Sequence, residues 1–440
     1  MKKKWICLAL LAMLIGLLSG CSIRTINELY CVPKRSESYM NLQSEIDKVM
    51  QGLEYSAPVA GENRQTVQMK DLDGDGEDEF LLFAKGSSEK PLQIFIFAGD
   101  GEEYHLVDTI ESTGTAVEQV EYVRMDSTGG YELVVGRQVS DQVLRSVSVY
   151  SMIDGQMTQL MNANYSKFVC ADLNGDRHSE LLILRPGSDS TENGVAELYG
   201  FSDEVLERSN EINMSEPVDS IKRIMISKLN DEIPAVYVAS DVNGSAIITD
   251  VFAIVNDQFT NVSFSNESGT SVQTLRNYYV YADDIDDDGI LELPDLITMQ
   301  ATLNSQNTGN QYLIRWYAMT STGEEVDKMY TYHNFVDGWY LQLDSATALR
   351  MNVVQQGSSY EFSIWNEEQK AMDKLMTIYA LTGQNREEQA QVNNRFVLYR
   401  TESTVYASDL EVASATYGIT KEALLNGFHL ILQDWYTGET

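Results

Sequence analysis

The sequence is poor in cysteine, histidine and basic residues. Only four of its 440 residues are Cys and four are His. The histidines are scattered, no HExxH motif is present and His and Cys do not cluster, so the sequence gives no support for a zinc site. A GxSxG nucleophile elbow and a P-loop are also absent. Carboxylate pairs suited to glycoside hydrolysis stay open, because 66 acidic residues make chance pairs inevitable.

The chain also lacks an apolar run long enough to be a membrane-spanning helix near its start. The run Trp5–Leu18 has 14 residues, fewer than the roughly 20 that a spanning helix needs, and it follows Lys2–Lys4. This pattern predicts a signal peptide over residues 1–20. Leu18-Ser19-Gly20 before Cys21 resembles the lipobox of bacterial lipoproteins. The resemblance implies that Cys21 carries lipid and anchors the chain to the outer face of the cytoplasmic membrane.

The scarcity of cysteine argues against a disulfide framework. Cys7 lies in the predicted signal peptide and Cys21 is the predicted lipid site, which leaves Cys31 and Cys170, far apart in sequence. Whether these two pair stays open. Cys170 lies in the strand-like stretch 168–171, and we expect it to be a buried, unreactive thiol.

Acidic residues outnumber basic residues by 66 to 31, giving a net charge of −35. The predicted signal peptide contains three lysines and no acidic residue, so its removal takes the net charge to −38. Such a chain should repel nucleic acid and anionic lipid headgroups. We interpret the charge as a source of solubility outside the cell combined with calcium ligation; a cationic partner is the alternative.

Three acidic loops share one spacing. Each offers carboxylates or an amide at positions 1, 3 and 5, a backbone carbonyl at position 7 and a carboxylate at position 9. Calcium takes six to eight oxygens, and a chain coiling around it delivers alternate residues inward. The loops therefore predict up to three structural calcium sites. Their ligand sets are Asp71, Asp73, Asp75, Glu77 and Glu79; Asp172, Asn174, Asp176, His178 and Glu180; and Asp284, Asp286, Asp288, Ile290 and Glu292.

The three loops differ at position 6, which is Gly76 and Gly289 in two of them but Arg177 in the second. If that turn needs a positive φ, Arg177 carries strain, so we expect the second site to be the weakest. An EF-hand is disfavoured because it needs glutamate at position 12, where this chain has Leu, Ile and Asp. Acidic β-turns without metal are the remaining alternative.

The acidic loops also mark a repeat. Asp71, Asp172 and Asp284 lie 101 and 112 residues apart, and halving these intervals gives units of about 50 to 56 residues with about four short strands each. Repeats of this kind are expected of propeller blades. The sequence therefore predicts an all-β fold, a β-propeller of about six to seven four-stranded blades. Residues 21–64 would form the tether and an amphipathic helix, 65–345 the blades, and 346–440 the last blade or blades and a C-terminal cap.

Two short helices are predicted to flank these strands. Apolar residues at helical spacing place one over residues 40–52, and the second covers Lys421–Asn426 with Thr420 as its N-cap. Trp316, Trp339 and Trp365 are expected in the blade cores. A sixth blade without an acidic loop is predicted from four stretches: Trp339–Leu343, Met351–Val354, Tyr360–Trp365 and Leu375–Tyr379.

The segments DLDGDGEDEFLLF, DLNGDRHSELLIL and DIDDDGILELPDL resemble FG-GAP/VCBS repeats. Such repeats occur in the integrin α-subunit N-terminal propeller and in many lipoproteins of low-GC Gram-positive bacteria. The resemblance covers about residues 65–345 and implies a calcium-braced propeller whose metal loops join adjacent strands within a blade. It does not imply integrin-like ligand binding, because function does not travel with the fold.

Taken together, the sequence predicts an extracellular lipoprotein whose propeller is a binding or scaffolding module for an unknown protein or glycan ligand. An extracellular hydrolase or lyase acting on polysaccharide or peptide is one alternative. An accessory lipoprotein of an envelope complex is another. No catalytic residue can be named from the sequence.

Overall fold

The structure is a computed structural model. The predicted signal peptide, Cys21 and Cys31 lie outside the part of the chain that it describes. Within that part, no helix combines the length and the apolar character needed to cross a bilayer. The described residues are 37–100, 103–139, 144–187, 193–202, 205–277, 280–299 and 312–431.

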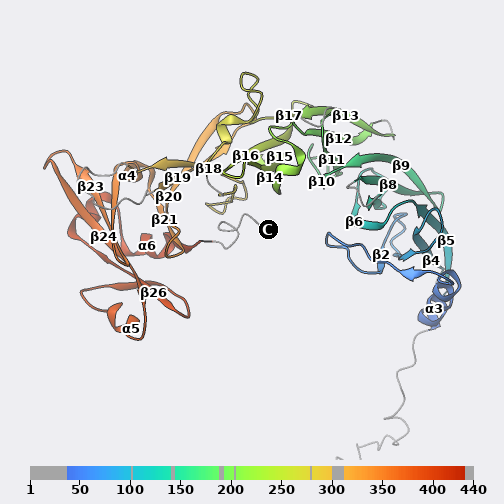
Figure 1. The fold of residues 1–440 in the computed structure, drawn as a ribbon, viewed down its shortest axis with the longest axis horizontal. Helices are drawn as coiled ribbons and strands as arrows, with labels where there is room; N and C mark the ends of the chain where they lie inside the picture. Colours follow the sequence, from blue (N-terminus) through green and yellow to red (C-terminus); the bar gives the residue numbers. More distant parts are fainter. Residues whose placement is uncertain are drawn as a thin grey trace, which may run out of the picture.

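The described strands form six antiparallel sheets that follow one another along the chain (Figure 1). The first sheet contains β1 (Glu54–Tyr55), β2 (Val67–Lys70), β3 (Glu79–Lys85), β4 (Leu92–Asp100) and β5 (Glu103–Ser112). The second contains β6 (Ala116–Val123), β7 (Glu132–Gln138), β8 (Arg145–Ile153) and β9 (Gln156–Tyr165). The third contains β10 (Lys167–Ala171), β11 (Glu180–Arg185), β12 (Val195–Ser202) and β13 (Val205–Asn213).

The remaining three sheets are built in the same way. The fourth contains β14 (Ile221–Asn230), β15 (Ile233–Val242), β16 (Ala246–Val255) and β17 (Gln258–Asn261). The fifth contains β18 (Leu293–Thr298), β19 (Tyr312–Met319), β20 (Glu325–Asn334), β21 (Trp339–Leu343) and β27 (Phe428–Leu430). The sixth contains β22 (Met351–Gln356), β23 (Ser359–Asn366), β24 (Ala371–Thr382), β25 (Phe396–Arg400) and β26 (Thr404–Leu410). The helices are α3 (Glu37–Val49), α4 (Ser345–Ala348), α5 (Arg386–Gln389) and α6 (Lys421–Gly427), with 3₁₀ turns at Val218–Ser220, Val272–Thr274 and Val412–Tyr417.

Neighbouring sheets pack face to face and share one apolar core at each junction. Along β3, Leu81 and Phe83 face the second sheet and pack against Leu133 and Val135 of β7. The same alternation joins the second sheet to the third, and so on to the sixth. Successive side chains of a strand point to opposite faces of the sheet. A strand in a sheet packed between two others must therefore be apolar on both faces. This explains the continuous apolar runs that follow the acidic loops.

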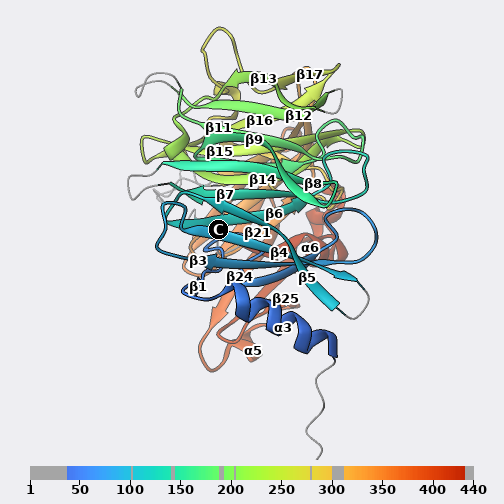
Figure 2. The same ribbon diagram turned by 90° about the vertical axis from the view of Figure 1, so that its right-hand side faces the viewer.

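The prediction of an all-β chain of antiparallel sheets is confirmed; three of the six described sheets have the predicted four strands and three have five. In the described residues, however, the sheets form an open arc with the first and sixth sheets at its two ends, and no ring is closed (Figure 1; Figure 2). The two end faces are covered in another way. Leu42 and Ile46 of α3 pack against Leu82 and Phe95, on the face of the first sheet that is turned away from the second.

The sixth sheet is covered by its own tail. Ala390, at the end of α5, is fully buried against Leu381, Val405 and Ala407 on the outer side of β24 and β26. A terminal sheet that has no neighbour must hide its apolar surface from water, as the capping units of repeat proteins do. At the other end of the arc, the helix predicted over residues 40–52 is α3, which begins three residues earlier and ends at Val49. It covers the outer face of the first sheet.

The prediction of a sixth blade that begins with Trp339–Leu343 needs correction. Trp339–Leu343 is not the first strand of a sixth blade but β21 of the fifth sheet, paired with β20. The turn between β20 and β21 explains this pairing. Asn334 Oδ1 accepts hydrogen bonds from the amides of Val336 and Asp337, and Gly338 has φ +71°. This tight turn makes β20 and β21 a hairpin.

The tail strands then take different places. Strands β25 and β26 complete the sixth sheet, whereas β27 pairs with β21. Helix α6 is confirmed, since Thr420 Oγ1 accepts a hydrogen bond from the Ala423 amide at 3.1 Å. Trp316 and Trp339 are fully buried as expected, but Trp365 is 41% exposed. Cys170 is a free, half-buried thiol whose pKa is raised by burial.

Five of the six sheets carry a β-bulge in the pairing of two consecutive strands: β4 with β5, β8 with β9, β12 with β13, β19 with β20, and β23 with β24. In the fifth sheet Trp316 pairs with Met329 and Tyr317 with Asp327, so Lys328 is the extra residue. A bulge re-aims the side chain of its extra residue. The residues at the equivalent position of the other sheets are Val107, Leu160, Ser209 and Leu375.

Candidate metal centres and an adjacent cleft

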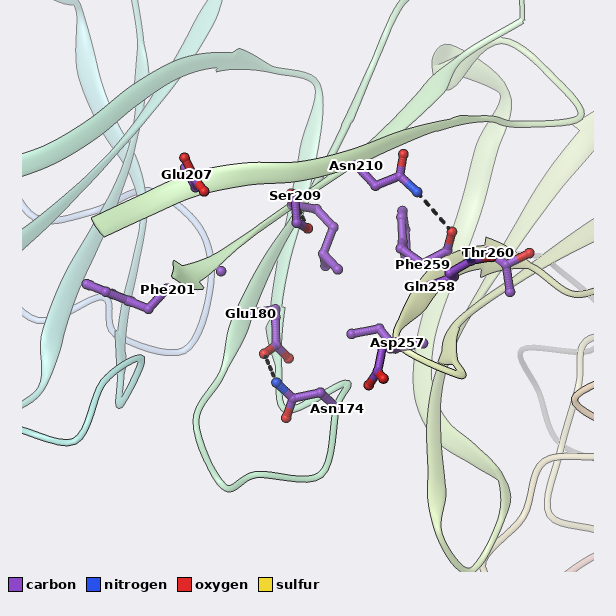
Figure 3. A pocket seen from close by; sticks show the side chains of 13 residues that line it. Asn174, Glu180, Phe201, Glu207, Ser209, Asn210, Asp257, Gln258, Phe259 and Thr260 are labelled. Carbon is purple, nitrogen blue, oxygen red and sulfur yellow. Dashed lines mark hydrogen bonds between the residues drawn. The ribbon is translucent and has the colours of Figure 1, made fainter. Parts of the chain in front are cut away.

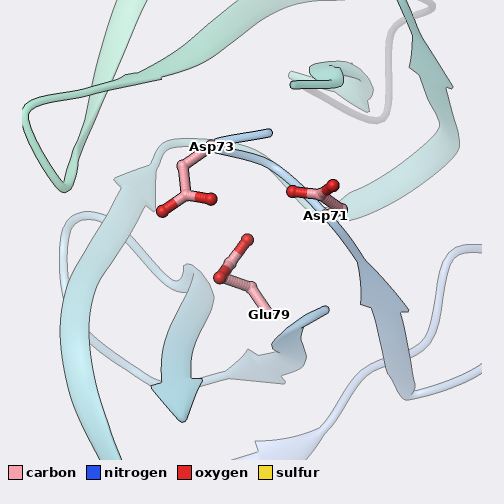
Figure 4. Close-up of side chains that lie close together, drawn as sticks. All are labelled: Asp71, Asp73 and Glu79. Carbon is pink, nitrogen blue, oxygen red and sulfur yellow. The ribbon is translucent and has the colours of Figure 1, made fainter. Parts of the chain in front are cut away.

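The first acidic loop brings three carboxylates together between β2 and β3. Carboxylate oxygens of Asp71, Asp73 and Glu79 all lie within 4.8 Å of one another, and the three side chains point toward a common centre (Figure 4). Asp73 is exposed, whereas Glu79 is only 3% exposed. This set could hold a metal ion, because hard divalent cations prefer carboxylate oxygens at such spacing.

Hydrogen bonds to the backbone give the loop its shape. Asp71 accepts bonds from the amides of Gly74 at 2.7 Å and Gly76 at 3.2 Å, and Asp75 accepts one from Glu77 at 2.8 Å. The other two loops repeat this pattern, with Asp172 accepting from Gly175 and Arg177, and Asp284 accepting from Asp288 and Gly289. The coiled conformation is thus encoded by the aspartates themselves.

A buried glutamate closes each loop. Glu79 accepts a hydrogen bond from the Leu72 amide at 2.7 Å, Glu180 from Leu173 at 2.7 Å and Glu292 from Ile285 at 3.2 Å. Burial, aided by the neighbouring aspartates, raises the pKa of Glu79 and Glu180 to about 7 and that of Glu292 to about 8. A raised carboxyl pKa means that negative charge in the loop is poorly compensated by the protein alone. A bound cation would supply that compensation.

The second loop differs from the first in its third position. Asn174 Nδ2 donates to Glu180 Oε1 at 2.7 Å and to Asp176 Oδ2 at 3.0 Å, so an amide group lies between the two acids. Arg177 has φ +76°, close to the φ of +81° at Gly289. The positive φ on which strain at Arg177 depends is therefore present, and a residue with a Cβ adopts it at some cost.

The third loop also gathers three carboxylates, from Asp284, Asp286 and Glu292. In this loop a lysine takes part. Lys328 Nζ lies 2.6 Å from Asp288 Oδ2, 3.9 Å from an oxygen of Asp286 and 4.0 Å from Glu292 Oε1. The first and third loops thus both converge, but only the third contains a basic side chain of the protein among the described ion pairs.

A cleft of about 870 Å³ lies beside the second loop, between the third and fourth sheets (Figure 3). Asn174 and Glu180 of the loop line it, so the loop and the cleft share residues. At the other end Asn210 of β13 donates to the Phe259 carbonyl of β17 at 3.2 Å and links the two sheets. The remaining lining residues are Leu198, Gly200, Phe201, Glu207, Ser209, Ile254, Asp257, Gln258 and Thr260.

No family model matches the sequence, and no curated protein matches it. Solved structures do match, at 12% identity. A protein from Lactobacillus plantarum matches over 72% of this chain and 86% of its own, with a TM-score of 0.27. The rhamnogalacturonan lyase YesW matches over 73% and 64%, with a TM-score of 0.30. The Bacillus licheniformis rhamnogalacturonan lyase PL11 matches over 73% and 72%, with a TM-score of 0.28.

These similarities are too distant to support a statement about activity. The resemblance to FG-GAP/VCBS repeats, the lipid anchor and the extracellular location stay predictions, because no match tests them. What the structure adds is geometry. Asp71, Asp73 and Glu79 converge as predicted, as do Asp284, Asp286 and Glu292.

Some predicted ligands lie outside these convergent sets. Asp75, Asp176 and Asp288 bind the amides of Glu77, His178 and Ile290, the residues predicted to offer carbonyls, and so shape the loop ends. In the second loop, Asp172, Asp176 and Glu180 do not converge as a triple carboxylate set in the described residues.

Sequence reasoning missed a fourth closing glutamate. In the second sheet Glu132 accepts a hydrogen bond from the Met125 amide at 2.8 Å, with the seven-residue separation seen between Leu72 and Glu79. That separation was the available signal. The residue that corresponds to Asp71 is Arg124 in this loop, so the aspartate of position 1 is missing. Glu132 therefore stabilises the turn in a loop that lacks the predicted calcium ligands.

Proposed function

We propose that this chain is an exported, lipid-anchored binding module whose N-terminal sheets are braced by calcium at the first acidic loop. The observation that carries the proposal is the convergence of Asp71, Asp73 and Glu79 beside a contact between two sheets. A Cβ on Gly130 would lie 2.3 Å from the Leu72 carbonyl oxygen, so the first loop is in backbone contact with the next unit. A cation held there would stabilise the loop and, through it, the junction of the first and second sheets.

Calcium fits this donor set better than a softer metal. The first loop offers carboxylates and no imidazole or thiolate, which is the set that hard cations prefer. When bound, calcium would neutralise the Asp71, Asp73 and Glu79 carboxylates. Its role is structural, because the ligands come from a single loop that holds β2 next to β3.

Calcium titration calorimetry on chelator-stripped protein tests this part of the proposal. We expect Asp73→Asn to weaken or abolish the tightest binding event, because it removes one of three convergent carboxylates. Asp219→Asn is the matched control, since Asp219 is exposed and lies outside the acidic loops. Equal calcium binding by both variants and the parent chain would contradict the proposed site.

The cleft between the third and fourth sheets is the proposed ligand site. Its lining offers amide and hydroxyl groups from Asn210, Gln258 and Thr260, together with the apolar Phe201. No Lys or Arg is among the described lining residues, and three acids are. This lining suits a neutral glycan, which presents hydroxyl groups and no charge, and disfavours an acidic one.

Titration with neutral oligosaccharides tests the ligand assignment. Gln258→Ala removes an exposed amide of the cleft, and we expect at least a threefold loss of affinity. Gln391→Ala is the control, because Gln391 is also exposed but follows α5 in the C-terminal region. If no neutral oligosaccharide binds, or if both variants bind as the parent does, the glycan assignment is wrong.

A second candidate function is hydrolysis of a polysaccharide. It is favoured by one observation, namely that Glu207 and Asp257 supply carboxylates to the cleft from outside the acidic loops. Two carboxyl groups flanking a glycosidic bond are the usual machinery of such enzymes. Release of reducing ends from neutral polysaccharides, lost in Asp257→Asn, would establish this function in place of binding alone.

The predicted anchor has its own test. Lipid at Cys21 should place the full-length chain in the membrane fraction, and Cys21→Ala should release it or block its maturation. A Cys7→Ala variant is the control within the predicted signal peptide. Unchanged fractionation of the Cys21 variant would show that the lipobox resemblance is fortuitous.

A further inference from the structure

The third acidic loop contains a cation that the protein itself provides. Lys328 of β20 places its ammonium 2.6 Å from Asp288, 3.9 Å from Asp286 and 4.0 Å from Glu292. Glu292 is completely buried, and its Oε1 accepts no hydrogen bond from the described residues. The ammonium is therefore within ion-pair distance of a buried carboxylate oxygen that has no hydrogen-bond donor among the described residues.

Lys328 reaches the loop because it is the extra residue of the bulge between β19 and β20. The equivalent position is Val107 in the first sheet and Ser209 in the third, and neither side chain can neutralise an acid. Leu160 and Leu375 take the same place in the second and sixth sheets. The fold thus accepts apolar residues here, so a lysine is not required by the bulge itself.

The first loop gives the contrast. Among the described residues, no Lys or Arg forms an ion pair with Asp71, Asp73 or Glu79, although this loop has the same aspartates and the same closing glutamate as the third. The two loops also differ at position 4, which is Gly74 in the first and Asp287 in the third, but of the two only the third has a described ammonium among its carboxylates. A protein ammonium and a divalent cation in contact with the same carboxylates repel each other strongly at 3 to 4 Å.

We propose that Lys328 is a built-in substitute for calcium in the third loop, which holds Asp286, Asp288 and Glu292 without metal and excludes calcium from that loop. The inference rests on the proposed function, in which the first loop binds calcium. It divides the molecule into a calcium-dependent N-terminal part and a fifth sheet whose acidic loop stays folded in the absence of calcium. The ligand class of the latent third site is a hard divalent cation.

Calcium stoichiometry of the stripped full chain tests the proposal. Lys328→Val installs the residue type that the first sheet carries, and we expect it to bind one more calcium ion per chain than the parent. Lys228→Met is the matched control. Its Cε lies 3.7 Å from a Cβ placed on Gly289, but its ammonium is paired with Asp231 at 2.7 Å, so its removal should leave the stoichiometry unchanged.

Two results would overturn the inference. One is a Lys328→Val chain that binds no additional calcium although its first loop still binds. The other is loss of a calcium ion when Asp286→Asn is introduced with Lys328 present, since the third loop would then already be occupied. Failure of the proposed function looks different, because then the parent chain binds no calcium and Asp73→Asn changes nothing.

Hydrogen exchange of the parent chain gives a second readout that does not depend on folding of the Lys328 variant. We expect calcium to slow amide exchange at least tenfold over residues 71–79 and to leave residues 284–292 unchanged. Equal protection of both loops by calcium would contradict the role of Lys328. Sodium chloride at the same ionic strength is the control, because a monovalent cation screens charge without replacing calcium in a carboxylate site.

Discussion

Single residues set the differences between otherwise equivalent loops, and Arg177 is the clearest case. Its φ of +76° is a conformation that glycine adopts at no steric cost and other residues adopt at about 1 kcal/mol or more. We predict that Arg177→Gly leaves stability unchanged or raises it by up to about 1 kcal/mol, because relief of strain offsets the entropy lost by glycine. It should also tighten calcium binding, since a positive charge leaves the loop.

Urea unfolding with and without calcium measures both effects. Asp154→Gly is a suitable control, because Asp154 has φ +52° in a hairpin turn away from any acidic loop. It should change stability without a calcium-dependent component. A clear loss of stability in Arg177→Gly would show that the side chain contributes more than its strained backbone costs.

His333 gives a prediction for pH. Burial lowers its pKa from 6.5 to about 3, and its ring stacks on Tyr340 with centroids 5.0 Å apart. The unfolded chain therefore binds this proton more tightly than the folded chain. Stability from the neutral ring is complete above pH 6.5 and is lost as pH falls from 6.5 toward 3, by about 3 kcal/mol at pH 4.

The comparison of variants isolates this contribution from that of the many carboxylates. We predict that the unfolding free energy of His333→Gln changes less between pH 7 and pH 4 than that of the parent chain, whatever its absolute value. Gln391→Ala should keep the parental slope, because it changes an exposed residue that has no titratable group. Identical slopes for the His333 variant and the parent would contradict the prediction, because the ring would then bind a proton as readily in the folded chain as in the unfolded chain.

The convergent acids could be predicted because they lie close together in the sequence. Their partner Lys328 could not, because it is distant in the sequence. Asp71, Asp73 and Glu79 lie within nine residues, so one turn of chain decides whether they meet. Lys328 lies far along the chain from Asp288, and their contact depends on the register of β19 with β20 and on a bulge within it. Neither the register nor the bulge is encoded in a local pattern.

At the scale of elements, helix α3 is the cap of the first sheet and should be needed for it. Ile46 is 8% exposed and packs with Leu82 and Phe95. We predict that Ile46→Ala destabilises the chain by about 2 to 4 kcal/mol, because the cavity that it leaves adds to the lost burial. Met40→Ala should cost little, since Met40 is 62% exposed.

Urea unfolding and hydrogen exchange at β3 are the measurements for this pair. If Ile46→Ala leaves the amide hydrogen exchange of β3 unchanged, α3 does not stabilise the first sheet and is not its cap. The sequence predicted α3 from its helical spacing, and the strands from their apolar runs between turns. It did not predict which sheet β21 and β27 would join, because that choice depends on the Asn334 turn and on contacts with residues far along the chain.

For the whole molecule, calcium should matter most at the N-terminal end. We predict that chelation lowers the melting temperature by several degrees, because a ligand present at one hundred times its dissociation constant stabilises the folded state by about 2.7 kcal/mol. Re-addition of calcium should restore it, and Asp71→Asn should abolish the difference. If chelation leaves the melting temperature unchanged, calcium does not stabilise the folded chain.

The covered ends of the arc have a consequence for how long such a chain can be. In a closed ring the angles between blades must add up to one full turn, so the number of blades is restricted to a few values. An arc whose first sheet is covered by α3 and whose last sheet is covered by the α5 segment has no such condition. Sheets can be gained or lost between the two covers while every junction that remains keeps its own core.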